Sequence, residues 1–270
     1  TGRAVTRKAL ATMKANLIVG SGTALAHWRQ SERLANLPSI ELAHLLPPGS
    51  RAVIVAPHPD DEVLGSGGLL QMANALGRSI LLISVTDGTA SHPGSSRWPT
   101  HDLAHQRASE SEQALARLGL ALPRLQWVRG GFADSQVQAR EAALGSFIQQ
   151  FLRPGDVVFS TWREDGHCDH DAVGRASALA AKNVGAAVHE LPIWTWHWAH
   201  DDDPRVPWHR ARRINLSEQQ VARKRDAAQA FTSQLSADPS TGAPAVLSPL
   251  ALERLLQPFE LVFVQDRERP

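Results

Sequence analysis

The sequence contains a single cysteine and no tyrosine, and its 28 Lys and Arg residues almost balance its 27 Asp and Glu residues. One cysteine excludes a framework of disulfides within the chain and is compatible with a reducing compartment, so we expect a cytoplasmic protein. The balanced charge provides no basic field for nucleic acid or for an acidic membrane surface. No apolar run approaches the ~20 residues that a membrane-spanning helix needs. With these partners excluded, a small molecule is the expected substrate. The sequence does not decide whether the protein forms a homo-oligomer.

Length and periodicity predict an α/β protein. The chain has 270 residues, 43% of them hydrophobic, which is enough to bury a sizeable core. Short apolar runs, expected to be strands, occur at 52–56, 80–85, 125–128, 156–160, 187–191 and 259–264. Stretches of helical periodicity occur at 62–76, 101–118, 137–152, 170–183, 217–234 and 249–257. Because strands and helices alternate, we expect a mostly parallel, Rossmann-like sheet with helices on both faces.

A stiff turn at 47–49, with the sequence Pro-Pro-Gly, marks the expected start of the catalytic domain. Residues 1–50 are expected to form an N-terminal helical extension, and residues 51–270 a single domain. Within the extension, residues 4–19 carry an apolar stripe opposite basic side chains. This pattern is typical of an amphipathic helix packed on a domain.

A histidine and three carboxylates follow directly on the apolar run 53–56, in the sequence PHPDDE at 57–62. Charged side chains at the end of a buried strand must lie at a sheet edge where a cation can compensate them. His58 and Asp61 are three residues apart, so both can face one point at the start of a helix. Asp60 projects differently and is a candidate general base. The alternative is a solvated acidic loop with helix-capping residues.

A second cluster, His167-Cys168-Asp169-His170, follows another apolar run. If a helix begins near Asp169, both imidazoles can approach the same side, where one would bind the metal and the other could face the substrate. Cys168 would then be turned by ~100° from His167, which favours a filler role over a thiolate ligand. Ligands in open parallel sheets bind beyond the carboxyl ends of the strands, so the two clusters are expected to meet there.

The glycines at 65, 67 and 68 invite a nucleotide-binding interpretation, with Asp87 placed to hold a ribose. This interpretation fails because Leu70 stands where the third glycine is needed. The preceding carboxylates would also repel a pyrophosphate. We expect these glycines to allow close packing of a helix against the sheet.

Together the two clusters resemble the PIG-L/LmbE-like family of zinc-dependent N-deacetylases, which includes enzymes that act on N-acetylglucosaminyl conjugates. Further similarity is carried by Thr86-Asp87-Gly88, Arg107, Glu110, Leu118-Gly119, Lys224 and Ser233-Gln234. The resemblance covers about residues 50–265, so it implies that residues 51–270 are an LmbE-like deacetylase domain.

The resemblance implies a role for each residue of the two motifs. Zn²⁺ would be held by His58, Asp61 and His170. Asp60 would be the general base, and His167 would polarise the scissile carbonyl and stabilise the tetrahedral intermediate.

Three further positions are informative. The resemblance implies that Asp169 orients His167 and that Arg107 contacts the substrate. Cys168 departs from the family pattern, in which proline is frequent between the histidines. Asp165 stands where some members place a tyrosine that assists catalysis.

The implied function is hydrolysis of an N-acyl group, with N-acetyl favoured, from an amino sugar or sugar conjugate. A second hypothesis is a non-haem iron oxygenase that uses His58, Asp60 and His170. Its usual β-rich scaffold disagrees with the alternation of strands and helices. A third hypothesis is a noncatalytic sugar-binding module that retains the metal, against which the intact Asp60 and His167 argue.

Two long irregular stretches, 87–100 and 192–213, are candidate walls of the substrate pocket. The second contains three alternating tryptophans, Trp194, Trp196 and Trp198. In a strand they would share one face, where indoles can stack on sugar rings or fill a core, and we favour packing in a core or between subunits. The basic residues at 210–213 are expected to form a solvated strand edge.

Overall fold

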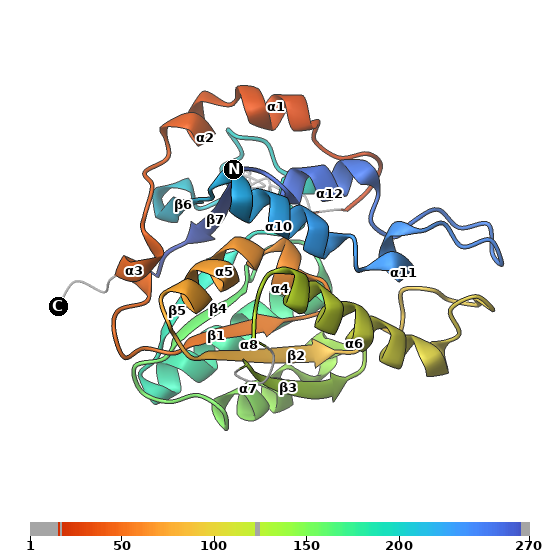
Figure 1. Ribbon diagram of the computed structural model, residues 1–270, viewed down its shortest axis with the longest axis horizontal. Coiled ribbons are helices and arrows are strands. Elements are labelled where there is room, and N and C mark those ends of the chain that lie inside the picture. The colour runs from red at the N-terminus through yellow and green to blue at the C-terminus, as the bar shows by residue number, and fades with distance from the viewer. Residues whose placement is uncertain (1–15, 17, 122–124, 266–270) are drawn as a thin grey trace, which may run out of the picture.

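The computed structural model describes residues 16, 18–121 and 125–265 (Figure 1). Nearly all of the helix expected at 4–19 lies outside the described residues, so that expectation is not tested. None of the described helices is both long and apolar enough to cross a membrane.

One seven-stranded sheet forms the centre of the molecule, with the order β3-β2-β1-β4-β5-β7-β6. The strands are β1 (Ala52–Ala56), β2 (Ile80–Thr86), β3 (Leu125–Phe132), β4 (Val157–Thr161), β5 (Ala187–Leu191), β6 (Ala211–Asn215) and β7 (Phe259–Phe263). The first five strands in this order are mutually parallel, whereas β7 pairs antiparallel with β5 and β6 pairs antiparallel with β7. The predicted mostly parallel α/β sheet is therefore confirmed, with β6 at the edge.

The longer helices lie on both faces of the sheet (Figure 1). The helices described before β4, short ones and the 3-10 helix η2 included, are α1 (Leu25–Gln30), α2 (Glu32–Asn36), α3 (Leu42–Leu45), α4 (Asp61–Leu64), α5 (Gly67–Ala75), α6 (Thr100–Arg117), η2 (Val137–Arg140) and α7 (Glu141–Gln149). After β4 they are α8 (Cys168–Val184), α9 (Thr195–Trp198), η3 (Trp208–Arg210), α10 (Glu218–Ala228), α11 (Thr232–Leu235) and α12 (Pro249–Leu255). Three of the predicted helices, 62–76, 137–152 and 217–234, are each broken in two.

Alternating side chains of β1 explain the two covered faces. Ile54 packs into a core shared with α5, α6 and α10, whereas Val53 and Val55 pack into a core shared with α7 and α8. All five residues of β1 are buried, because a central parallel strand has a core on each side.

A third core lies beyond the antiparallel end of the sheet, where α1 lies beside α12 (Figure 1). Trp28 of α1 is 2% exposed, and its indole Nε1 donates to the backbone oxygen of Trp196 at 2.9 Å. The ring of Trp196 contacts those of Trp28 and Phe259, at centroid distances of 5.0 and 6.1 Å. The described part of the N-terminal region is thus packed onto the C-terminal part of the chain.

The three tryptophans do not lie on a strand, contrary to the alternation in the sequence. They lie in and just before the single helical turn of α9. Trp196 is buried, and Trp198 stacks on Trp162 at a centroid distance of 6.3 Å. Core packing is therefore their main role, although Trp194 and Trp196 also line a cavity.

The glycines at 65, 67 and 68 lie close to side chains of α10 and of the segments at 193 and 216, and α5 also contacts β2 and β7 of the sheet, as expected. A Cβ on Gly68 would lie 2.3 Å from Leu216 Cδ2. The backbone N–H groups of Gly68 and Leu69 donate to the Glu260 carboxylate, at 2.7 and 2.8 Å, and Lys224 Nζ lies 2.7 Å from it. The start of α5 is therefore occupied by a carboxylate of the chain itself.

Candidate metal centre

The two histidine clusters meet at the carboxyl ends of β1 and β4, which are neighbours in the sheet. His58 follows β1, and Asp61 is the first residue of α4. His170 lies in the first turn of α8, which follows β4. The strand order reverses at this point, because β2 lies on the other side of β1.

Asp61 lies between two of the histidines. Its Oδ2 is 3.4 Å from His58 Nδ1 and 3.2 Å from His170 Nε2. Ligand atoms at about 2.0–2.1 Å from a tetrahedral ion lie roughly 3.3 Å apart, so these separations suit such an ion. His170 Nε2 is buried and makes no hydrogen bond among the described residues, which is expected of a nitrogen that faces a metal.

Two groups of side chains could hold an ion in the described part of the chain. One is His58, His167 and His170, whose ring nitrogens lie within 4.8 Å of one another. The other is His58 with Asp134 and Asp169. The Asp61 contacts favour an ion on the Nδ1 side of His58, close to His170.

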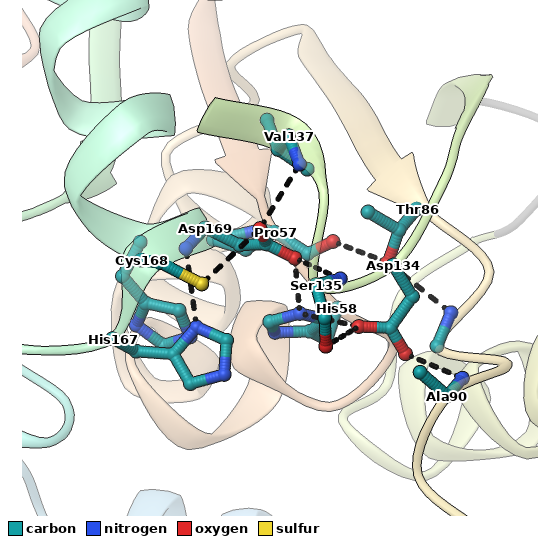
Figure 2. A network of polar contacts seen from close by, with 12 residues as sticks. Pro57, His58, Thr86, Ala90, Asp134, Ser135, Val137, His167, Cys168 and Asp169 are labelled. Atoms are coloured by element: carbon teal, nitrogen blue, oxygen red, sulfur yellow. Dashed lines mark hydrogen bonds and ion pairs between the residues drawn. The ribbon is translucent and has the colours of Figure 1, made fainter. Parts of the chain in front are cut away.

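The opposite nitrogen of His58 faces two carboxylates (Figure 2). His58 Nε2 lies 3.2 Å from Asp169 Oδ2 and 3.3 Å from Asp134 Oδ1. A histidine that binds a metal through one nitrogen ordinarily gives its other N–H to a carboxylate. Asp134 and Asp169 are therefore placed to fix the orientation of the His58 ring.

The expected contact between the Asp169 carboxylate and His167 is absent. This carboxylate accepts the N–H groups of Ser135 and Val137, at 2.7 and 3.1 Å, and faces His58. His167 caps α8 instead, so that its Nδ1 accepts the backbone N–H of Asp169 at 3.2 Å (Figure 2). Asp169 therefore contacts His167 through its backbone N–H and not through its carboxylate.

Asp165 holds the ring of His170, with 2.9 Å between its Oδ2 and His170 Nδ1. The Asp165 carboxylate is fully buried and also accepts four hydrogen bonds from Ile193 N, Trp194 N, Thr195 N and Thr195 Oγ1, at 2.6 to 3.0 Å. One carboxylate therefore fixes both a candidate metal ligand and α9. Sequence reasoning noted Asp165 only as the residue in the place of a tyrosine.

Asp60 occupies a strained and buried position beside this cluster. Its φ of 133° lies in a region that favours glycine, and its N–H donates to Glu62 Oε2 at 2.9 Å. Burial raises the pKa of Asp60 to about 7, while the nearby Arg107 opposes this shift and the charges of Asp61 and Glu62 add to it. A carboxylate with such a pKa can both take and give a proton near neutral pH.

Arg107, the expected substrate contact, is 3% exposed and is held by the chain itself. It donates to the backbone oxygens of Gly88 and Pro59, at 2.9 and 2.5 Å, and to Asp60 Oδ2 at 3.1 Å. Gly88 has a φ of +65°, and a Cβ there would lie 2.0 Å from Arg107 Nη1. The glycine of the Thr-Asp-Gly motif thus makes room for the arginine that holds Asp60.

Opposite charges stabilise one another around Asp61. Burial would raise the pKa of Asp61, but His170 and His58 hold it well below its ordinary value. Burial would lower the pKa of His170, but Asp61 and Asp165 raise it to about 9. The pKa of His58 is raised well above its ordinary value by the three carboxylates that contact it, although burial opposes this. A divalent cation would replace the protons on these histidines.

His167 behaves differently from the other two histidines. Burial, together with the charges of His170 and His58, lowers the pKa of His167 to about 4. Its imidazole is therefore neutral at pH 7. Since Nδ1 accepts a hydrogen bond, the remaining proton is assigned to Nε2.

A cavity of about 800 Å³, open solvent at its mouth included, adjoins these residues. Its polar side is lined by His58, Asp60, Asp61, Arg107, Asp134, His167 and His170. The irregular stretches 87–100 and 192–213 both contribute to its wall, through Ala90 and Ser91 and through residues 193, 194, 196 and 197. Both stretches therefore line this cavity, as expected, and its use by a substrate stays a prediction.

Comparison with known proteins gives one family and several relatives. Residues 53–181 match the family model PIG-L, described as GlcNAc-PI de-N-acetylase. One relative is the 1D-myo-inositol 2-acetamido-2-deoxy-alpha-D-glucopyranoside deacetylase of Mycolicibacterium gilvum (strain PYR-GCK), to which the chain is 30% identical over 179 residues. The matched region covers 58% of this chain and 62% of that relative. The deacetylase of the same name from Rhodococcus jostii (strain RHA1) is 29% identical over 163 residues, 51% of this chain and 55% of that relative. The chain thus spans less than two thirds of the length of these curated relatives.

Among solved structures, the zinc-inhibited form of teicoplanin deacetylase Orf2 superposes with a TM-score of 0.60 at 17% identity, over 80% of this chain and 99% of that chain. The A40926 pseudoaglycone deacetylase Dbv21 superposes with a TM-score of 0.56 at 24% identity, over 80% and 96%. Similarity at these identities shows a shared fold.

Proposed function

Residues 53–181 of this chain belong to the PIG-L family, and from this premise we propose that the protein is a zinc-dependent hydrolase that removes an N-acyl group from an amino sugar or sugar conjugate. The expected acyl group is acetyl, as the names of the curated relatives suggest. The products are then a carboxylate and a free amine.

One observation carries the proposal: the Asp61 carboxylate lies between His58 Nδ1 and His170 Nε2, beside a cavity that also contains Asp60. Two imidazoles and one carboxylate form a ligand set typical of catalytic zinc, which keeps further positions open. The carboxylates behind both imidazoles support the same assignment.

Asp60 is the proposed general base. A zinc ion held by these ligands would supply Lewis acidity and lower the pKa of a water bound to it. Burial raises the pKa of Asp60, which makes its carboxylate a better base, able to accept a proton from the attacking water and return it to the leaving amine. Arg107 and Glu62 hold Asp60 in place for both steps.

His167 is the proposed partner of the oxygen on which negative charge develops. Its neutral ring carries the proton on Nε2, because Nδ1 accepts the Asp169 N–H at the start of α8. The ring lines the cavity, so Nε2–H can donate to the substrate carbonyl oxygen as it becomes an oxyanion.

The oxygenase hypothesis needs Asp60 to be a ligand. Its carboxylate instead pairs with Arg107, at 3.1 Å, whereas Asp61 lies between the histidines. This arrangement favours the hydrolase.

The test is acetate release from a panel of N-acetylated amino sugars and their conjugates by zinc-loaded protein. We expect turnover that is lost on chelation and restored by zinc, and lost in Asp60→Asn. Asp102→Asn, an exposed carboxylate of α6, is the matched control and should retain activity. Absence of acetate release across the panel, or equal rates for Asp60→Asn and the unmodified chain, would contradict the proposal.

A further inference from the structure

The cavity beside the candidate metal centre has a second side that is apolar. It is lined by Leu64, Ile193, Trp194, Trp196, Leu247 and Leu255. Val246 also lines the cavity and is 41% exposed, so it adds accessible apolar surface to this lining. Apolar surface that faces open space in a concave site is where a ligand buries an apolar group.

This apolar wall is supported from behind. Trp196 contacts the rings of Trp28 and Phe259, and Trp28 Nε1 donates to its backbone oxygen at 2.9 Å. The wall therefore has its shape before any ligand binds. A ligand that packs on this wall therefore orders few side chains, and binding loses little conformational entropy.

The wall also has a fixed position relative to the candidate metal ligands. Asp165 accepts the N–H groups of Ile193 and Trp194, both at 2.9 Å, and contacts His170 Nδ1 at 2.9 Å. A group attached to the reacting amide, or to the sugar that bears it, would therefore meet the wall at a defined distance.

Two polar side chains of the cavity lining, Arg254 and His197, already make contacts within the chain. Arg254 donates through Nε to the backbone oxygen of Thr23 at 2.7 Å, and its Nη1 lies 3.2 Å from His197 Nδ1. His197 Nε2 lies 3.0 Å from the backbone oxygen of Val19. Hydroxyl groups of a sugar that packed against Arg254 and His197 would find those side chains already engaged, whereas hydrocarbon needs no hydrogen-bond partner.

We propose that the substrate carries an apolar group of several carbons near the reacting amide, and that this group packs on the apolar lining that includes Trp194, Val246 and Leu247. The inference rests on the proposed function, since it names the substrate class for the same site. The group is either the acyl chain itself or an apolar aglycone of the sugar.

Two series of substrates distinguish these sources. The first varies the acyl chain on one amino sugar from acetyl through butyryl to hexanoyl. The second keeps N-acetyl and varies the glycoside from methyl through butyl to hexyl. Each buried CH₂ is expected to raise kcat/KM up to about fourfold, until the chain fills the cavity. An increase along the first series identifies the acyl chain, and an increase along the second identifies the aglycone.

Val246→Ser tests the location, because Val246 is partly exposed and its replacement leaves the core intact. The increase per CH₂ should be smaller in this variant. Leu179→Ser is the matched control, since Leu179 is 58% exposed on α8 and does not line the cavity. Its increase should equal that of the unmodified chain.

The outcomes separate this inference from the proposed function. Hydrolysis of the shortest compounds with no increase along either series would overturn the inference and leave the proposed function intact. An increase of equal size in Val246→Ser would also overturn it. Failure to hydrolyse any compound of either series would contradict the proposed function, and the inference with it.

Discussion

The two sides of the cavity are built in different ways. Most of the polar side comes from two short motifs, 57–62 and 167–170, that follow neighbouring strands, and Arg107 and Asp134 complete it. Most of the apolar side comes from residues 193–196, the segment at 246–247 and α12, with Leu64 of α4, and it is supported by α1. Chemistry and recognition therefore depend on largely different parts of the chain, which α4 and Asp165 connect. A substitution on one side should have little effect on the function of the other.

The largest expected effect is that of Asp60→Asn on the polar side. Because Asp60 is the proposed general base, kcat should fall by about 10²- to 10⁴-fold. The bound zinc, measured by elemental analysis, should stay at the level of the unmodified protein. Loss of zinc in this variant would instead make Asp60 a ligand and support the oxygenase geometry.

The second largest effect is expected from Trp28→Ala, which removes a side chain that supports the apolar side from behind. Trp28→Ala removes a buried indole behind Trp196, and the free energy of unfolding should fall by about 3–5 kcal/mol. Zinc affinity should change by less than about twofold, since Trp28 contacts none of the candidate ligands. Chemical denaturation of zinc-loaded protein and a zinc titration measure the two quantities. A large loss of affinity would show that the two sides are not separate.

Asp165 is the residue that contacts both sides, so its replacement should affect both. In Asp165→Asn, zinc affinity should fall by about 10- to 100-fold, because His170 loses the carboxylate that orients it. The preference for apolar substrates should fall as well, because one of the two oxygens that accept N–H groups at 193–195 becomes an NH2 group, which cannot accept. Glu164→Gln, at the exposed neighbouring position, is the control and should change neither quantity.

A smaller, graded effect is expected from pH. Without a metal, His170 has a pKa of about 9, so below that pH zinc must displace its proton. The apparent affinity for zinc should therefore decrease as pH falls from about 9, by at least about tenfold per unit. Isothermal titration at several pH values measures this slope together with the protons released. An affinity that does not change between pH 6 and pH 8 would contradict the assignment of His170 as a ligand.

The sequence predicted the polar side well because its cause is local. An apolar run that leads into His58, Asp60 and Asp61 can end only at a sheet edge, and the parallel order of strands brings the second motif to the same edge. The fold followed from the same alternation of strands and helices, and the structural comparison confirms it.

The residues that hold the ligands could not be predicted in this way. Asp134 follows β3, two strands away from β1, so its contact with His58 depends on the path of a loop. Asp165 looks in sequence like an ordinary acidic loop residue, because its partners at 193–195 come from beyond the next strand. Its carboxylate captures those N–H groups, which explains why the alternating tryptophans form a helical turn instead of a strand.

The most direct test of the proposed metal centre is the position of zinc in crystals of the loaded protein, located by anomalous scattering at the zinc edge. We predict one peak about 2.0–2.2 Å from His58 Nδ1, Asp61 Oδ2 and His170 Nε2. A peak on the other side of the same imidazole, bound by His58 Nε2, Asp134 and Asp169, would contradict it.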